Sequence, residues 1–97
     1  TVIKQYPSPL GTNCVLYAKS RGAVPTGVSS LGKKISKIKS HTPEKNKIGV
    51  TKEGPVGHFV VVEKVNDDGT LTISEGNYRH SFVTWRIIPQ TMVVGFL

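Results

Sequence analysis

The stretch GHFVVVEKVNDDGTLTISEGNY, residues 57–78, carries most of the information about the fold. It holds two runs rich in Val, Ile and Thr, at 58–65 and 70–76, and such runs are typical of β-strands. The NDDG sequence at 66–69 between them is a strong turn signal. The stretch therefore predicts an antiparallel hairpin.

The register of this hairpin brings polar side chains together. A four-residue turn pairs Val65 with Thr70, and a two-residue turn shifts the pairing by two residues. Because side chains alternate between faces, either register puts His58 on the face that carries Glu75 and Asn77, whereas a slip by one residue would separate them. Burying these three groups on an aliphatic face is costly, so we interpret them as a candidate functional trio.

Two helices are predicted ahead of the hairpin. Residues 14–21, CVLYAKSR, can be capped by Thr12 or Asn13 and are stopped by Gly22. Over residues 28–39, apolar residues recur at three- and four-residue spacing, which predicts a second amphipathic helix.

Further strands are predicted at 47–51, 80–88 and 92–96. Residues 1–11, with two prolines and a glycine, are interpreted as an extended arm. Helices followed by antiparallel strands indicate an α+β fold with about five strands. We predict a single domain over residues 1–97, since this length supports one modest core.

Composition excludes several classes of protein. The chain has 97 residues, 37% of them hydrophobic, and no run approaches the roughly 20 apolar residues of a membrane-spanning helix. One cysteine excludes an internal disulfide and a multi-cysteine zinc site. The chain opens with Thr1 rather than Met, from which we expect a processed product or an excised domain.

Positive charge is concentrated in one segment. The net charge is +7, and Lys33–Lys52 holds seven lysines and one glutamate, a net of +6. Such a patch favours a polyanionic partner, namely nucleic acid, an anionic membrane or a bacterial wall with its carboxylates and phosphates, while a simply solvated surface is an equally good interpretation. No aromatic residue lies among these lysines, so we expect no specific nucleic-acid binding.

The single cysteine is either an inert small hydrophobe or a nucleophile. Cys14 lies in the first turn of a predicted helix, where the helix dipole favours a thiolate. A catalytic cysteine needs a base, which His58 can supply, and an acceptor that orients the base, which Glu75 or Asn77 can supply. Backbone N–H groups at the helix start, such as that of Cys14, can form the oxyanion hole.

The segments NCVLYAKSR (13–21), residues 57–78 and MVVGFL (92–97) resemble the CHAP domain, the cysteine, histidine-dependent amidohydrolase/peptidase family. The shared pattern is a Cys that opens a helix, a Gly-His that leads a strand, an Asp-Gly turn, and Ser-Glu-x-Asn followed by an aromatic residue. The resemblance covers nearly the whole chain.

This resemblance implies a papain-like fold, with one or two N-terminal helices packed on an antiparallel half-open β-barrel. It implies hydrolysis of amide bonds in peptidoglycan, by an N-acetylmuramoyl-L-alanine amidase or a stem or cross-bridge endopeptidase of the lysin or virion-associated type. Cys14 would be the nucleophile, His58 the base and Glu75 the orienting residue. Asn77 would be an auxiliary group.

The same resemblance sets expectations about ligands and place of action. We expect no cofactor and no metal, because residues 1–13 lack the carboxylates that a calcium loop needs. We expect Asn13, Tyr78 and Trp85 to border the substrate, although packing within the sheet is the favoured interpretation of Trp85. Arg86 could meet substrate carboxylates, but exposed strand arginines are common. We expect a monomer that acts outside the cell, at the bacterial wall.

Two other functions fit the sequence. One is a non-catalytic binder of wall or polyanion that uses the Lys33–Lys52 segment. The other is the same apparatus acting on a small γ-glutamyl or polyamine amide, although the positive charge of the chain disfavours a cationic substrate.

Overall fold

The computed structural model describes residues 1–8, 13–76 and 82–97. Its elements are β1 (Val2–Pro7), α1 (Cys14–Arg21), α2 (Leu31–Ile35), β2 (Ile48–Thr51), β3 (His58–Val65), β4 (Thr70–Gly76), β5 (Phe82–Pro89), the 3-10 turn η1 (Gln90–Met92) and β6 (Val93–Phe96). This is an α+β fold, as the sequence predicts.

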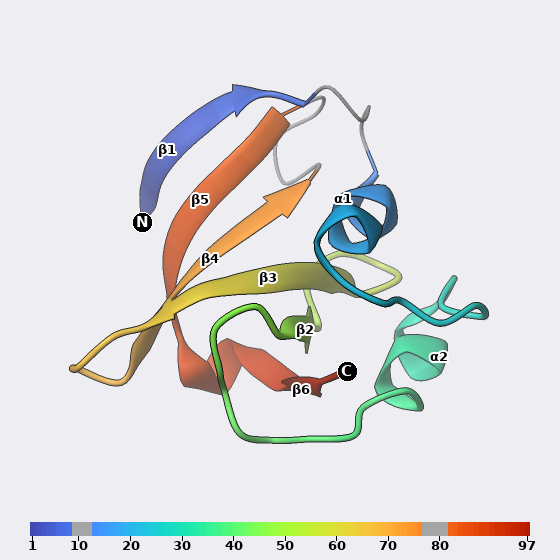
Figure 1. Ribbon diagram of the computed structural model, residues 1–97. Helices are drawn as coiled ribbons and strands as arrows, with labels where there is room; N and C mark the ends of the chain where they lie inside the picture. The colour runs from blue at the N-terminus through green and yellow to red at the C-terminus, as the bar shows by residue number, and fades with distance from the viewer. Residues whose placement is uncertain (9–12, 77–81) are drawn as a thin grey trace.

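One six-stranded sheet forms the body of the protein, in the order β1-β5-β4-β3-β2-β6. Every neighbouring pair is antiparallel. The sheet twists strongly, so that β1, β5 and β4 run steeply across the direction of β3, while both helices lie toward the right of Figure 1. Its edges are β1 and β6; a half-open barrel stays a prediction.

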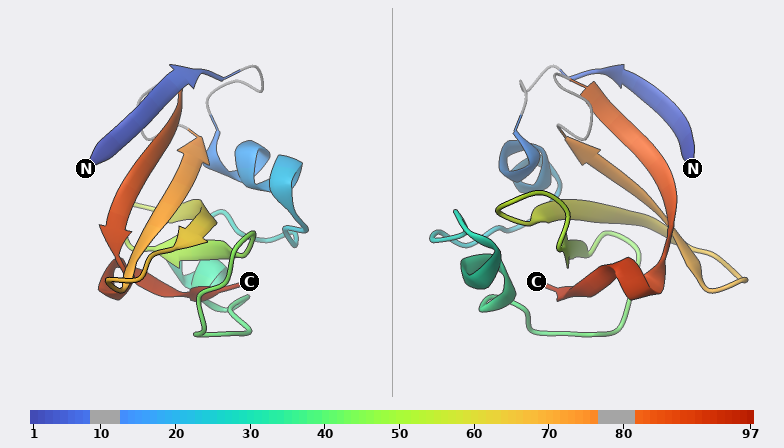
Figure 2. Two further views of the ribbon diagram at one scale, coloured as in Figure 1. Left: turned by 60° about the vertical axis from the view of Figure 1, so that its left-hand side comes forward. Right: turned by 180° about the vertical axis from the view of Figure 1, so that it is seen from behind.

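The N-terminal arm is a strand, which corrects the expectation of about five strands. Val2–Pro7 pairs with β5, although all six of its residues are exposed. It runs along the outer edge of the sheet in both views of Figure 2. Its pairing with the open edge of β5 makes this extended segment a strand, and Pro7 ends it, as proline does at sheet edges.

The second predicted helix is much shorter than residues 28–39. Ser30 caps α2 by accepting a hydrogen bond from the Lys33 N–H, and the helix ends at Ile35. Lys39 then donates its N–H to the carbonyl of Phe96 at 2.9 Å, and residue 40 bridges to the same strand. Pairing with β6 therefore overrides the helical pattern of the sequence.

The hairpin register near the site is the predicted one, although the turn differs. Val65 pairs with Leu71 rather than Thr70, but a bulge between Val62 and Lys64 shifts the register, so Val61 pairs with Ser74. The Asn66 N–H closes the turn on the Thr70 carbonyl at 2.9 Å. The bulge compensates for the longer turn and keeps His58 on the face of Glu75.

Two apolar clusters occupy the two faces of the sheet. One lies under α1 and includes Tyr17, Ala18, Phe59, Val61 and Val83. The other, on the opposite face, consists of Val60, Val62, Leu71, Ile73, Ile88 and Phe96. Among the described residues, no helix has the length and apolar character to cross a membrane.

Candidate active site

Cys14 is the first residue of α1. Asn13 caps this helix, because its side-chain oxygen accepts a hydrogen bond from the Val15 N–H at 2.7 Å. Burial by itself raises the pKa of the thiol, but a hydrogen bond with His58, the Phe59 N–H and the positive charge of His58 outweigh it and lower the pKa below 9.0. The site therefore favours the thiolate.

His58 opens β3 and is buried. Burial disfavours the imidazolium, but hydrogen bonds with Cys14 and Glu75, and their negative charges, raise the pKa of His58 to about 9. The opposite shifts of the two groups have one cause, since each stabilises the charge of the other. The two shifts together favour a thiolate–imidazolium pair over a neutral thiol beside a neutral imidazole.

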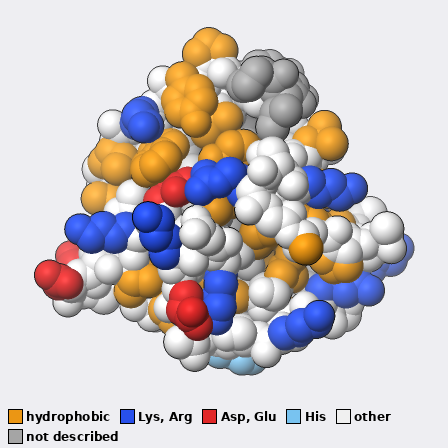
Figure 3. Space-filling model, viewed as in Figure 1, with side chains coloured by type: hydrophobic (Ala, Val, Ile, Leu, Met, Phe, Trp, Pro, Cys, Tyr) orange, Lys and Arg blue, Asp and Glu red, His pale blue; other side chains and the backbone are white. Residues whose placement is uncertain are grey.

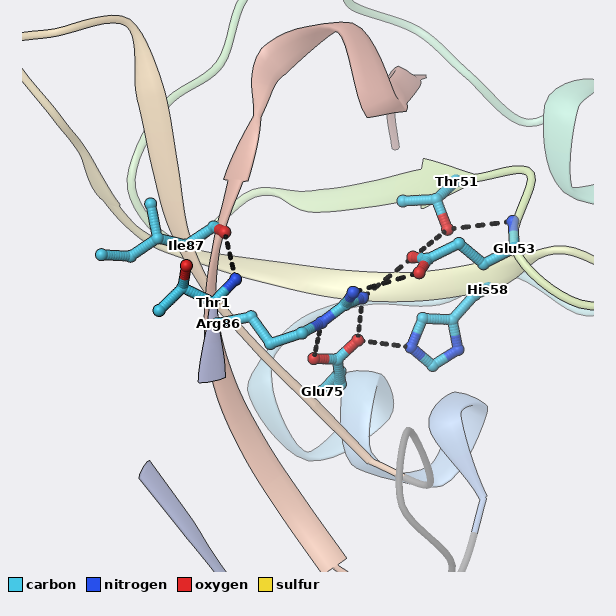
Figure 4. Close-up of polar contacts among 7 residues, drawn as sticks. All are labelled: Thr1, Thr51, Glu53, His58, Glu75, Arg86 and Ile87. Atoms are coloured by element: carbon cyan, nitrogen blue, oxygen red, sulfur yellow. Dashed lines mark hydrogen bonds and ion pairs between the residues drawn. The ribbon is translucent and has the colours of Figure 1, made fainter. Parts of the chain in front are cut away.

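Glu75 lies next to His58 on the same face of the sheet. Its side chain is 0% exposed, and its Oε1 is 2.9 Å from His58 Nε2 (Figure 4). Because Nε2 faces Glu75, the other ring nitrogen of His58 is the one left for Cys14. The structure thus connects the three residues by contacts, from Cys14 to His58 and from His58 to Glu75.

Arg86 belongs to this cluster, although sequence reasoning treated it as a strand arginine free to meet substrate. Its guanidinium is buried between the carboxylates of Glu75 and Glu53 (Figure 4). The feature that could have indicated this contact is the position of Arg86 on β5. It lies two residues from Thr84, which pairs with Glu75, and therefore on the same face of the sheet as Glu75.

Lys34 is a second buried cation that sequence reasoning missed. The side chain is 2% exposed, and its Nζ donates to the carbonyls of Val28 at 2.8 Å and Val56 at 2.9 Å. Its charge contributes to the lowered pKa of Cys14. The sequence feature that could have indicated its burial is its spacing. Lys34 follows Leu31 by three residues and so lies on the apolar side of the predicted helix.

The other predicted residues lie in different places. Trp85 packs with the cluster under α1, on the opposite face of the sheet from Glu75, and Lys4 lies 4.1 Å from its ring centre. Asn13 is exposed at the start of α1, beside Cys14. Asn77 and Tyr78 lie outside the described residues. Their roles and that of Trp85 stay predictions.

Ligands for a metal ion do not gather in the described part of the chain, where no three His, Cys, Asp or Glu side chains converge. The cluster around His58 instead pairs the carboxylates of Glu75 and Glu53 with cations. A thiol with a lowered pKa beside a histidine that can donate a proton suits acyl transfer.

Comparison with known proteins matches the CHAP domain family to residues 3–77. The chain is 57% identical over 37 residues to the probable autolysin LDP of Staphylococcus aureus, covering 38% of this chain and 13% of the relative. It is 46% identical over 46 residues to the N-acetylmuramoyl-L-alanine amidase sle1 of Staphylococcus saprophyticus, covering 45% and 14%. It is 37% identical over 59 residues to the probable autolysin SsaALP of Staphylococcus aureus, covering 59% and 22%. The chain thus spans less than a quarter of each of these relatives.

Proposed function

Since the chain belongs to the CHAP domain family, we propose that it is a thiol-dependent hydrolase of amide bonds in bacterial peptidoglycan. The observation that carries this proposal is the line of contacts from Cys14 through His58 to Glu75. The names of the relatives, two autolysins and an amidase, support the substrate class.

In the proposed reaction the Cys14 thiolate attacks the carbonyl carbon of the amide. Backbone N–H groups at the start of α1 stabilise the oxyanion, and the His58 imidazolium protonates the leaving amine as the C–N bond breaks. The product is a thioester on Cys14. Water, deprotonated by the now neutral His58, then attacks the thioester, which releases the carboxylic acid and restores the thiol–histidine pair. Throughout, Glu75 holds the imidazole in place.

The finer features of the proposal concern the bond and the setting. The relative named as an N-acetylmuramoyl-L-alanine amidase favours cleavage between muramic acid and L-alanine, with cleavage within the stem peptide or cross-bridge as the alternative. We place the action outside the cytoplasm, at the bacterial wall. A lysin or virion-associated setting is part of the same proposal.

The test is the loss of turbidity of purified peptidoglycan, followed by mass spectrometry of the released fragments. We expect wild type to clear the suspension, and Cys14→Ala and His58→Ala to lose at least about 1000-fold in rate. His41→Ala is the matched control, because His41 is an exposed histidine. New termini on the fragments identify the bond. Equal clearing by wild type and Cys14→Ala would refute the nucleophile.

A second candidate function is the binding of anionic wall polymers, alongside or instead of catalysis. A groove of about 810 Å³ lies between the C-terminal ends of α1 and α2, and Lys37, Lys39 and Lys47 line it. Blue Lys and Arg side chains lie on the right and lower right of the face in Figure 3, where Figure 1 places α2, and others lie on its left and centre. A groove lined by both apolar residues and lysines suits a polymer that carries phosphates or carboxylates.

Co-sedimentation with purified walls tests this second function. We expect binding by Cys14→Ala to equal that of wild type, to weaken steeply as salt rises, and to fall in a Lys37→Gln, Lys39→Gln double variant. Lys19→Gln, an exposed lysine on α1, is the matched control. Salt-independent binding, or equal binding by all variants, would refute a role for the groove.

A further inference from the structure

Arg86 joins the candidate active site to a second carboxylate. Its Nε donates to Glu75 Oε2 at 2.7 Å and its Nη2 to Glu75 Oε1 at 2.6 Å. Its Nη1 and Nη2 also donate to the two oxygens of Glu53, at 3.1 Å and 2.9 Å. The Arg86 guanidinium therefore donates two hydrogen bonds to each of two carboxylates.

The fork on Glu75 defines the orientation of that carboxylate. His58 offers Glu75 one hydrogen bond, whereas Arg86 engages both oxygens. A bidentate arginine fixes the plane of a carboxylate as well as its position. With Arg86 in place, the Oε1 lone pairs are held toward His58 Nε2.

Arg86 itself is held from the other side by Glu53. This residue follows β2, and the Thr51 hydroxyl donates to Glu53 Oε1 at 3.0 Å. Thr51 pairs with His58 across β2 and β3, so the chain of contacts closes on the strand that carries the histidine. Figure 4 shows this line from Thr51 through Glu53 and Arg86 to Glu75 and His58.

We propose that Arg86, anchored by Glu53, is a positioning residue that fixes the Glu75 carboxylate against His58. The proposal rests on the proposed function, because it takes Cys14 as the nucleophile, His58 as its base and Glu75 as the residue that orients His58. Arg86 is 6% exposed and its guanidinium lies between two protein carboxylates, so it acts on the reaction through Glu75 rather than by holding substrate.

Charge balance gives a second reason for this arrangement. Two carboxylates beside one histidine would repel each other, and the histidine loses its charge in each catalytic cycle. Arginine stays protonated at every step, so Arg86 balances Glu75 when His58 is neutral. The pKa of Glu53 is lowered because, although burial opposes ionisation, the hydrogen bonds and charge of Arg86 outweigh it.

A double-mutant cycle tests the proposal with soluble muropeptides as substrate. We expect Arg86→Gln to lower kcat by about 10- to 100-fold with KM little changed, because a displaced Glu75 misaligns His58. In a Glu75→Gln background the same change should lower kcat by less than about 3-fold, since the residue it positions is gone. Full additivity of the two losses, or an effect on KM alone, would overturn the proposal.

Companion variants separate positioning from general stability. Arg86→Lys keeps the charge but cannot donate to both oxygens of Glu75 in one plane, so we expect kcat to fall, although by less than in Arg86→Gln. Glu53→Gln leaves Arg86 intact and should give a smaller fall in kcat in the same direction; it carries the test if Arg86→Gln does not fold. Lys64→Gln is the control, because Lys64 is an exposed cation on β3, the strand that carries His58. An equal fall of kcat in Lys64→Gln would overturn the proposal.

A readout without peptidoglycan keeps the proposal separate from the proposed function. Iodoacetamide reports the reactivity of the Cys14 thiolate whatever the natural substrate is. We expect Glu75→Gln and Arg86→Gln each to slow alkylation at pH 7 by about 3- to 10-fold, and the double variant to be no slower than Glu75→Gln. Slowing by Glu75→Gln with a wild-type rate in Arg86→Gln would refute positioning, even if the protein cleaves no wall.

Discussion

Cys14 and His58 set each other's charge. Neither environment would favour an ion by burial alone, because burial raises the pKa of the thiol and lowers that of the imidazole. The hydrogen bond between them reverses both effects, so that the pKa of Cys14 is lowered and the pKa of His58 is raised. Glu75 adds to the shift of His58, while Lys34 adds to that of Cys14. The charge state that the two groups favour is therefore a property of the pair.

Removing the thiol should consequently lower the pKa of His58. In Cys14→Ala the hydrogen bond and negative charge of Cys14 are lost, so we expect the pKa of His58 to fall from about 9 toward its ordinary value of 6.5. Titration of the His58 imidazole signals by NMR, in wild type and in Cys14→Ala, measures this change. An unchanged pKa of His58 would show that Glu75 alone sets it.

The loop between β2 and β3 controls where His58 begins its strand. Gly57, with a φ of +74°, turns the chain immediately before His58. A Cβ at this position would lie 2.8 Å from the Leu31 side chain and 3.2 Å from the Thr51 carbonyl. Gly54 in the same loop has nearly the same φ, +73°, but open space around it.

These two glycines make a matched pair of variants. We expect Gly57→Ala to lower the free energy of unfolding by about 2–4 kcal/mol and to lower activity, because strain and a clash with α2 both displace His58. Gly54→Ala should cost about 1 kcal/mol from strain alone and leave activity near wild type. Urea unfolding and turbidity assays measure both. Equal losses in the two variants would show that contact with α2 contributes nothing.

At the scale of the whole molecule, an ion pair joins the helix that carries Cys14 to the sheet. Arg21 in α1 binds Glu63 at the bulge of β3, and Glu63 also accepts from the Ser74 hydroxyl at 2.6 Å. Tyr17 completes this group, with its hydroxyl 2.7 Å from that of Ser74. The group lies on the face of the sheet under α1 and orients the helix.

Acid should weaken this attachment. Burial by itself raises the pKa of Glu63, but hydrogen bonds from Arg21 and Ser74 outweigh it and lower the pKa below 4.5. A carboxyl with a lowered pKa in the folded state adds stability above its unfolded pKa, and this stability is lost as the pH falls through the folded pKa. We therefore expect the urea concentration at the unfolding midpoint to decrease as the pH drops below about 4.5, through the lowered pKa of Glu63.

Variants identify the group responsible. Glu63→Gln should be less stable than wild type at pH 7 and should lose less on acidification, because one titrating carboxyl is gone. Glu44→Gln is the control, because Glu44 is an exposed carboxylate that pairs with Lys47 on the surface. An acid slope in Glu63→Gln as steep as that of wild type would assign the loss to other carboxylates, with Glu53 the first candidate.

Local sequence determined the hairpin of β3 and β4, the helix α1, and the placement of His58 on the same face as Glu75. Alternation in 58–65 and 70–76 defines both strands of the hairpin to the residue, and Asn13 with Gly22 bounds α1. Since alternation also decides which side chains share a face, it puts His58 and Glu75 on the same face of the hairpin. Adjacent residues and the fixed geometry of strands carry this information, so no long-range packing is needed to extract it.

Tertiary structure decided what depends on distant partners. The N-terminal arm became a strand because β5 had an open edge, and the helix predicted at 28–39 stopped at Ile35 because the residues beyond it pair with β6. The burial of Arg86 and Lys34 likewise follows from carboxylates and carbonyls far away in the chain. A lysine or arginine looks solvent-exposed in a sequence, since the groups that compensate its desolvation are brought to it only when the sheet is assembled.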